Sequence, residues 1–237
     1  MNNPHASRYP GIRSFERSEQ SLFFGRQKET HDLFEAVKVK PLTVLFSKSG
    51  IGKTSLINAG LAPVLEQNGY LPVFIRLQDT SVSPVETVQK VLSPFLDTQL
   101  LEKYSQTPTS LWEYVRACQF GNEQLPGNDQ PTPLTPVLIF DQFEELFTHE
   151  KSTRDDLTRA LADLLNERLP EGIRQGLRAY PRPMRTNEVL AWYEPLKIKV
   201  VFAILSNRLG DLDELKLHIA TVLHDRFHLK PLSRDNA

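Results

Sequence analysis

The chain has 237 residues, of which 40% are hydrophobic and 24% charged, values typical of a globular protein that can bury a sizeable core. Its formal net charge of −1 offers no overall field that would attract nucleic acid or a membrane surface, so we expect neither as a partner. The single cysteine excludes a disulfide within the chain, and the longest apolar runs are too short to span a bilayer, so we expect a cytoplasmic protein.

Apolar runs of strand length alternate with segments of helical period, after an N-terminal segment and helix over residues 1–40. Such alternation is typical of a parallel sheet covered on both faces. We therefore predict a three-layer α/β core over 41–237 with a five-stranded, mainly parallel sheet and an insertion at about 169–196. In chain order the pattern predicts a strand over 41–46, a helix over 53–67, a strand over 71–77, a helix beginning at Ser83 or Thr87, a helix over 110–120, a surface loop over 121–135, a strand over 136–140, a helix over 153–169, a strand over 197–205, a helix over 211–223 and a strand over 226–229.

The clearest motif follows the first predicted strand and opens the next helix. Glycines there let backbone N–H groups turn around phosphate oxygens, and the helix N-terminus favours an anion. Lys53 would reach the β- and γ-phosphates, and Thr54 would offer its hydroxyl to Mg²⁺. Ser47 replaces the first glycine of the usual Gly-x-x-x-x-Gly-Lys-[Ser/Thr] pattern, a change that we expect to cost little. The predicted nucleotide-binding residues of this loop are Lys48, Ser49, Gly50, Ile51, Gly52, Lys53, Thr54 and Ser55.

A second motif follows the apolar strand that ends before Asp141. This carboxylate would lie at the sheet edge beside the phosphate loop and, with Thr54, hold Mg²⁺ through water. Many such ATPases carry a water-activating glutamate directly after the aspartate, where this chain has Gln142. Glu144 and Glu145 follow, and either could act as general base, with Glu145 ahead of Glu144. Alternatively, both are solvated residues that favour the dipole at a helix start.

Together these motifs resemble the bacterial novel STAND NTPases, signalling ATPases with an AAA-like core that are related to the NACHT and NB-ARC switches. The resemblance covers nearly the whole chain, including the ending over 229–237. It implies ATP or ADP with Mg²⁺ as ligands, and it implies that Phe24, Gly25 and Arg26 lie near the adenine. The segments that carry it are Tyr9-Pro10-Gly11-Ile12-Arg13-Ser14-Phe15-Glu16, Phe23-Phe24-Gly25-Arg26, the phosphate loop with Ser55-Leu56-Ile57-Asn58-Ala59-Gly60-Leu61, and Asp141-Gln142-Phe143-Glu144-Glu145.

The chain departs from this family in two respects. The family's fourth strand usually ends in an arginine, one further residue and an aspartate, where this chain has Leu205, Ser206 and Asn207. The arginine that would sense the γ-phosphate is therefore missing, which affects hydrolysis more than binding. The family chain also normally continues into a helical module at the place of Ala237. The resemblance thus implies a fragment or a shortened protein, with self-association through modules that are not here.

The favoured function is an ATP/ADP-dependent switch for signalling or antiphage defence, with slow or impaired hydrolysis. One rival is a catalytically inactive module that holds nucleotide for structure, and another is a turnover AAA-type ATPase that remodels a substrate. In the insertion, four arginines could contact nucleic acid or a partner's phosphate, but a solvated face is the expected role. For Trp192 and Tyr193 we expect packing of the insertion onto the domain. The four arginines are Arg174, Arg178, Arg182 and Arg185.

Overall fold

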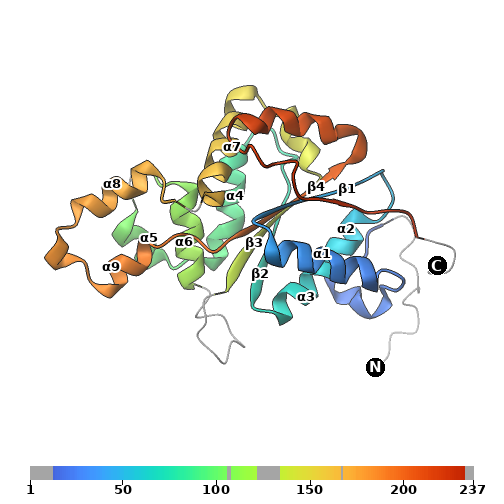
Figure 1. Cartoon of the computed structure of the whole chain (residues 1–237), viewed down its shortest axis with the longest axis horizontal. Helices are drawn as coiled ribbons and strands as arrows, with labels where there is room; N and C mark the ends of the chain where they lie inside the picture. The colour runs from blue at the N-terminus through green and yellow to red at the C-terminus, as the bar shows by residue number, and fades with distance from the viewer. Residues whose placement is uncertain (1–12, 106–107, 122–133, 167, 233–237) are drawn as a thin grey trace.

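A five-stranded parallel sheet organises the chain (Figure 1). The computed structural model describes residues 13–105, 108–121, 134–166 and 168–232. Their strands lie in the order β2-β3-β4-β1-β5, and each neighbouring pair is parallel. The predicted α/β class is confirmed, with a sheet that is wholly parallel. The strands are β1 (Leu42–Ser47), β2 (Tyr70–Ile75), β3 (Thr135–Asp141), β4 (Lys199–Leu205) and β5 (Arg226–His228).

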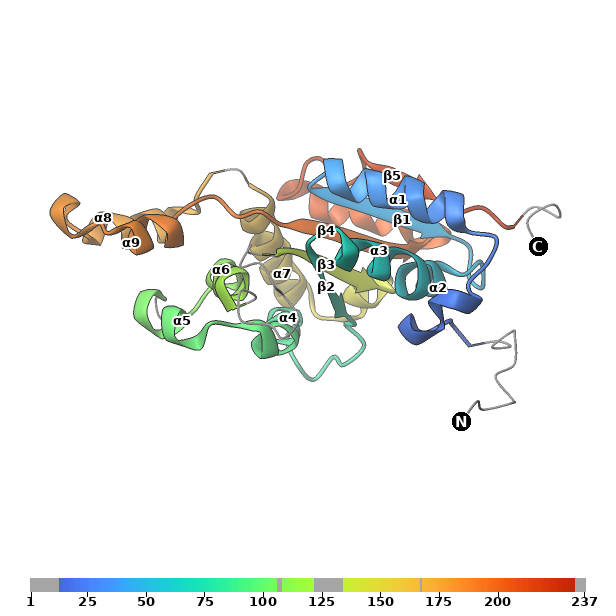
Figure 2. The ribbon, with the colours of Figure 1, turned by 90° about the horizontal axis from the view of Figure 1, so that it is seen from below.

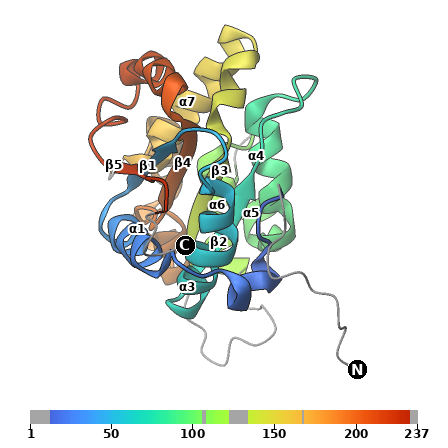
Figure 3. The ribbon, with the colours of Figure 1, turned by 90° about the vertical axis from the view of Figure 1, so that its right-hand side faces the viewer.

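Helices cover both faces of this sheet, which gives the three predicted layers (Figure 3). Because side chains alternate along a strand, Leu45 and Val201 pack into one apolar cluster, and Val44 and Phe202 pack into the other. The first cluster includes α1 (Gln27–Val39) and the helical stretch made of α2 (Lys53–Ser55), the π-helix η2 (Leu56–Leu61) and α3 (Ala62–Gln67). The second includes α4 (Pro84–Leu92), α6 (Leu111–Gly121), α7 (Lys151–Leu165) and the 3₁₀ helix η7 (Ser206–Leu217).

The start of α4 settles one of the alternatives left by the sequence. The backbone N–H of Glu86 donates to Ser83 Oγ at 3.2 Å, and the backbone N–H of Ser83 donates to Glu86 Oε2 at 3.3 Å. This reciprocal pair satisfies two helix-end donors, and Pro84 follows at the first helical position, where a missing N–H costs nothing. The helix therefore begins after Ser83, not at Thr87.

Other predicted boundaries were wrong. The helix expected over 211–223 is instead the 3₁₀ helix η7, followed by turns through Asp225. Leu209, Leu212 and Leu215 recur every third residue, a spacing that matches the three residues per turn of a 3₁₀ helix. The predicted loop over 121–135 lies almost wholly outside the described residues. Short elements that were not predicted include η1 (Arg17–Leu22), η3 (Ser93–Phe95) and α5 (Thr98–Tyr104).

The predicted insertion forms a helical arm at one end of the molecule, far from α2 at the other (Figures 1 and 2). Trp192 is 1% exposed, stacks on Phe120 at 6.2 Å between ring centroids and lies 5.3 Å from Tyr104, so its expected packing role is confirmed. Tyr193 is buried as well. Within the described part of the chain, no helix has the length and apolar content needed to cross a bilayer. The arm consists of α8 (Glu171–Ala179), η6 (Arg182–Met184) and α9 (Asn187–Trp192).

Candidate nucleotide site

A cavity of about 840 Å³ opens at the carboxyl edge of the sheet, where β1, β3 and β4 end. Ligands of open α/β sheets bind at this edge, because strand ends and helix starts meet there. The cavity gathers both sequence motifs and adds the segment that precedes η1. It is lined by Arg13, Ser14, Phe15, Ser49, Gly50, Gly52, Lys53, Thr54, Ser55, Asp141, Gln142, Glu144 and Leu205.

The loop after β1 has the backbone that a phosphate cradle needs. Gly50 and Gly52 adopt φ of 74° and 99°, in the left-handed region that side chains disfavour. A Cβ built on either glycine would meet nothing within 4 Å, so the dihedral, not crowding, requires glycine there. Ser47 closes β1 in ordinary strand geometry, so its side chain introduces no backbone strain. The serine at the first motif position is therefore compatible with the loop's geometry.

Lys53 lies buried at the floor of the cavity, 9% exposed. Its ammonium donates to the carbonyl oxygen of Ser47 at 3.4 Å and to Ser47 Oγ at 3.3 Å, both long contacts. Burial lowers the pKa of Lys53, and the nearby carboxylates of Glu144 and Asp141 oppose that shift. A buried ammonium whose hydrogen bonds are long and go to neutral oxygens gains strongly from a closer anion, so this position suits a phosphate.

Thr54 and Asp141 have the arrangement that a magnesium site requires. The Thr54 hydroxyl donates to Asp141, with its oxygen 3.1 Å from Oδ1 and 3.0 Å from Oδ2. A hydroxyl has one hydrogen to donate and two lone pairs, so the Thr54 oxygen keeps its acceptor capacity for a cation. Asp141 is 8% exposed and supplies the negative charge. Hard oxygen ligands of this kind are those that Mg²⁺ prefers, so these residues fit the ion.

The two glutamates after β3 have different surroundings. Glu144 lines the cavity, and its Oε2 accepts the backbone N–H of Leu205 at 3.3 Å. Glu145 is not part of the lining. The reason is local: Gln142 turns the chain with φ of 57°, and the 3₁₀ helix η5 (Phe143–Thr148) directs successive side chains about a third of a turn apart. Glu144 is therefore the glutamate of this pair that lines the cavity.

Burial raises the pKa of Glu145, and the carboxylates of Glu144 and Asp141 add to the rise, whereas Arg76 and the backbone N–H of Leu77 oppose it. The folded chain therefore holds a proton here more tightly than the unfolded chain does. Stability from this group is present at acid pH and is lost as pH rises through the raised pKa. We expect Glu145→Gln, which cannot ionise, to melt near wild type below about pH 4 and above wild type at neutral pH.

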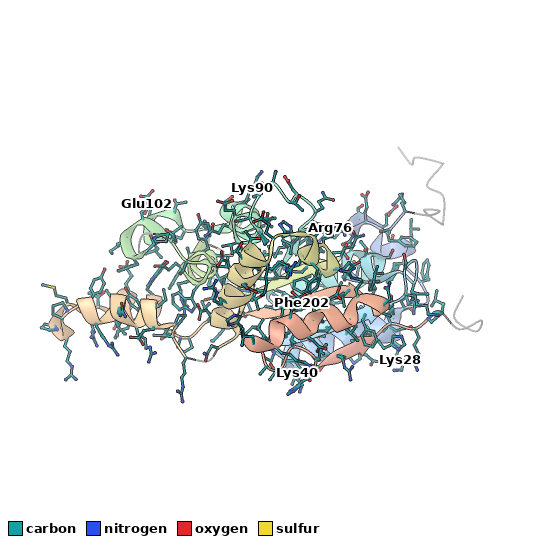
Figure 4. The ribbon with its side chains drawn as sticks, turned by 90° about the horizontal axis from the view of Figure 1, so that it is seen from above. Lys28, Lys40, Arg76, Lys90, Glu102 and Phe202 are labelled. Atoms are coloured by element: carbon teal, nitrogen blue, oxygen red, sulfur yellow. The ribbon has the colours of Figure 1, made fainter. Side chains whose placement is uncertain are left out.

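Calorimetric melting of the nucleotide-free chain across this pH range measures that difference. Glu102→Gln is the matched control, because Glu102 is an exposed residue on α5 (Figure 4), and its curve should follow wild type at each pH. A melting difference for Glu145→Gln that stays constant with pH would contradict the burial argument.

The Phe-Phe-Gly-Arg segment contacts the phosphate loop through Arg26 and is not part of the cavity lining. Arg26 is 5% exposed and donates to the backbone carbonyls of Ile51, at 3.1 Å, and of Lys230, at 2.8 Å. Gly25 permits the preceding turn with φ of 80°. Phe24 is 64% exposed and lines a separate hollow of about 380 Å³. Lys48 and Ile51 also lie outside the cavity lining, so the structure does not bring together every predicted nucleotide residue.

Sequence reasoning missed several residues of the site. Arg13 and Phe15 line the cavity from the N-terminal segment, and the Phe15 N–H donates to Ser55 Oγ at 3.1 Å, which joins this segment to α2. Arg76, directly after β2, donates from Nη1 to Asp141 Oδ2 at 2.7 Å. The run that contains Arg13 and Phe15 was noticed only as part of a family resemblance. Arg76 belongs to no motif, and only the strand order places it beside Asp141.

The family model for novel STAND NTPase 1 matches residues 9–236. The chain belongs to this family. The match includes the phosphate loop, the Asp141 strand and the whole arm of this STAND NTPase. A comparison with curated proteins gives no match.

A solved structure shows the same fold in an ATPase. The STAND chain is similar to a Walker-type ATPase of Pyrococcus abyssi, with a TM-score of 0.55 and 17% identity, over 94% of this chain and 58% of that one. It also aligns with the ADP form of the ORC2 protein of Aeropyrum pernix, with a TM-score of 0.43 and 12% identity, over 96% of this chain and 50% of that one. The chain thus spans 58% of the length of the Pyrococcus abyssi ATPase, and this likeness shows the fold of a P-loop ATPase.

Proposed function

We propose that the chain is an ATP- and ADP-binding switch domain of slow hydrolysis. The observation that carries this proposal is the Thr54–Asp141 contact beside the buried ammonium of Lys53, at the mouth of a glycine loop that opens a helix. This set of groups matches the charge of a nucleotide's phosphates and their magnesium ion. Membership of the STAND NTPase family supports the same conclusion.

Each group has a distinct role in this proposal. Backbone N–H groups of the loop hold the α- and β-phosphates, and Lys53 leaves Ser47 to contact the terminal phosphates. Thr54 and Asp141 hold Mg²⁺, which when bound neutralises part of the phosphate charge. Glu144 faces the cavity and orients the attacking water by accepting its proton.

Slow hydrolysis follows from the end of β4. Leu205 lines the cavity with an apolar side chain, and its backbone N–H is directed to Glu144. A donor at this position would stabilise charge on the γ-phosphate oxygens in the transition state, and loss of one such donor typically slows a reaction by about 10²–10³. The phosphates keep their loop contacts, so binding is retained while turnover falls.

The contacts of Arg26 support a nucleotide-dependent switch over a module that holds nucleotide only for structure. Its guanidinium donates from Nη2 to the carbonyl of Ile51 in the phosphate loop and from Nη1 to the Lys230 carbonyl beyond β5. A shift of the loop on nucleotide binding would therefore change the position of the segment after β5. Signalling or defence, cytoplasmic location and self-association are further parts of this proposal, and they are motivated by the family.

The experiment is Leu205→Arg, with Leu217→Arg as control because Leu217 is 84% exposed on η7. The wild-type chain should bind ATP and ADP about equally and release phosphate slowly, and Leu205→Arg should gain preference for ATP or gain rate. Phosphate release and calorimetric titration measure both quantities. Turnover by wild type near the ~10 s⁻¹ median of enzymes would favour the remodelling ATPase and overturn slow hydrolysis. No phosphate release by either protein would favour the inactive module.

A further inference from the structure

Arg76 forms an ion pair that neither the phosphate loop nor the glutamates explain. It follows Ile75 at the end of β2, the edge strand that pairs with β3. Its Nη1 lies 2.7 Å from Asp141 Oδ2, with the Arg76 side chain 38% exposed and that of Asp141 10% exposed. Figure 4 labels Arg76 on the part of the molecule away from Glu102 and the arm. The pair thus lies at the catalytic edge of the sheet.

The contact uses the carboxylate that the metal site needs. Asp141 already accepts the Thr54 hydroxyl, so its two oxygens serve a hydroxyl and a guanidinium at once. The positive charge of Arg76 stands beside Asp141 Oδ2, where the waters of a magnesium ion would have to bind. Two cations cannot share one carboxylate of low exposure without repulsion, because the local dielectric screens them poorly.

Arg76 also differs from the other basic side chains nearby. Lys53 is held by Ser47, and Arg13 pairs with Glu19 at 2.5 Å. At the end of β4 the chain has Leu205, and Arg208 is paired with Asp211. Among the residues that the structure describes, Arg76 is the arginine with an ion pair to Asp141.

We propose that Arg76 is the counterion of Asp141 in the metal-free site and that it leaves this carboxylate when nucleotide binds with Mg²⁺. Arg76 thereby sets how strongly nucleotide binding depends on magnesium. Without the ion, its charge keeps Asp141 from repelling the β-phosphate. When the ion binds, the Arg76 guanidinium must give up its contact with Asp141, and this loss weakens binding of the magnesium–nucleotide complex. This inference rests on the proposed nucleotide site and assigns a positioning residue to it.

The test is the affinity for ADP by calorimetry, in EDTA and in excess Mg²⁺. The Kd in EDTA divided by the Kd in excess Mg²⁺ measures magnesium dependence without any need for turnover. In Arg76→Gln the charge is lost while a donor to Asp141 remains, so folding should be preserved, and the ratio should rise about tenfold. Arg76→Lys keeps the charge and should give a ratio close to wild type. Arg174→Ala removes an exposed arginine of the distant arm and is the control.

The outcomes are distinguishable. A raised ratio in Arg76→Gln alone supports the inference. If wild type binds ADP and Arg76→Gln shows the wild-type ratio, Arg76 does not compete with the metal and the inference fails, while the proposed function stands. If Arg76→Lys shifts as far as Arg76→Gln, the effect is not one of charge and the inference also fails. If none of the four proteins binds ADP in either buffer, the proposed function fails, and this inference fails with it.

Discussion

Lys53→Ala is expected to abolish most of the stabilisation that Mg²⁺ and ADP give to the chain. A ligand present at 100 times its Kd stabilises the folded state by about 2.7 kcal/mol, which for a chain of this size raises the melting temperature by roughly 5–10 °C. The Lys53 ammonium is buried and its hydrogen bonds to Ser47 are long contacts to neutral oxygens, so it gains strongly from a phosphate. Thermal melting with and without nucleotide measures the effect.

The matched control is Lys38→Ala, because Lys38 is about half exposed on α1 and pairs with Glu35. This control should keep the full nucleotide-induced rise. Lys53→Ala without nucleotide should still melt cooperatively, since removal of a buried ammonium also removes its desolvation cost. If nucleotide raised the melting temperature of Lys53→Ala as much as that of wild type, the phosphates would have to bind elsewhere.

Glu144→Gln is expected to lower single-turnover phosphate release by about 10²–10⁴, the usual contribution of a general base. The substitution keeps an oxygen that can accept the Leu205 N–H, so the cavity wall should hold its shape. ADP affinity should change little, because the glutamate acts on water and not on the α- and β-phosphates. Radiolabelled ATP in excess enzyme gives the rate even where turnover is slow.

Glu145→Gln is the comparison, and its rate should fall far less, because Glu145 does not line the cavity. An equal or larger loss in Glu145→Gln would restore the ranking that the sequence alone suggested. An unchanged rate of phosphate release in Glu144→Gln would show that Glu144 takes no part in the reaction. The alternative that it is a solvated residue at a helix start would then stand.

Local spacing explains why much of the fold and the phosphate loop could be predicted. The loop residues are consecutive, and the glycines that need positive φ sit at the motif's fixed positions, Gly50 and Gly52. Asp141 follows an unbroken apolar run, so a parallel sheet must deliver it to the same edge as the loop. These inferences need no knowledge of tertiary contacts.

Other features of the site depend on contacts that spacing does not encode. Whether Glu144 or Glu145 faces the cavity is set by the turn at Gln142 and the 3₁₀ geometry after it. The position of Arg76 beside Asp141 depends on strand order, which the sequence leaves open. Phe24 was assigned to the adenine by resemblance, whereas here it is exposed beside a different hollow, so that assignment stays a prediction.

A crystal structure of the chain with Mg²⁺ and ADP would test the central claim most directly. The account predicts the β-phosphate among the backbone N–H groups of the loop, with the Lys53 ammonium turned from Ser47 toward it. It also predicts Mg²⁺ on the Thr54 hydroxyl oxygen, with Asp141 reached through water. ADP bound elsewhere, such as in the hollow beside Phe24, or a loop free of nucleotide in crystals grown with excess ADP, would contradict the account.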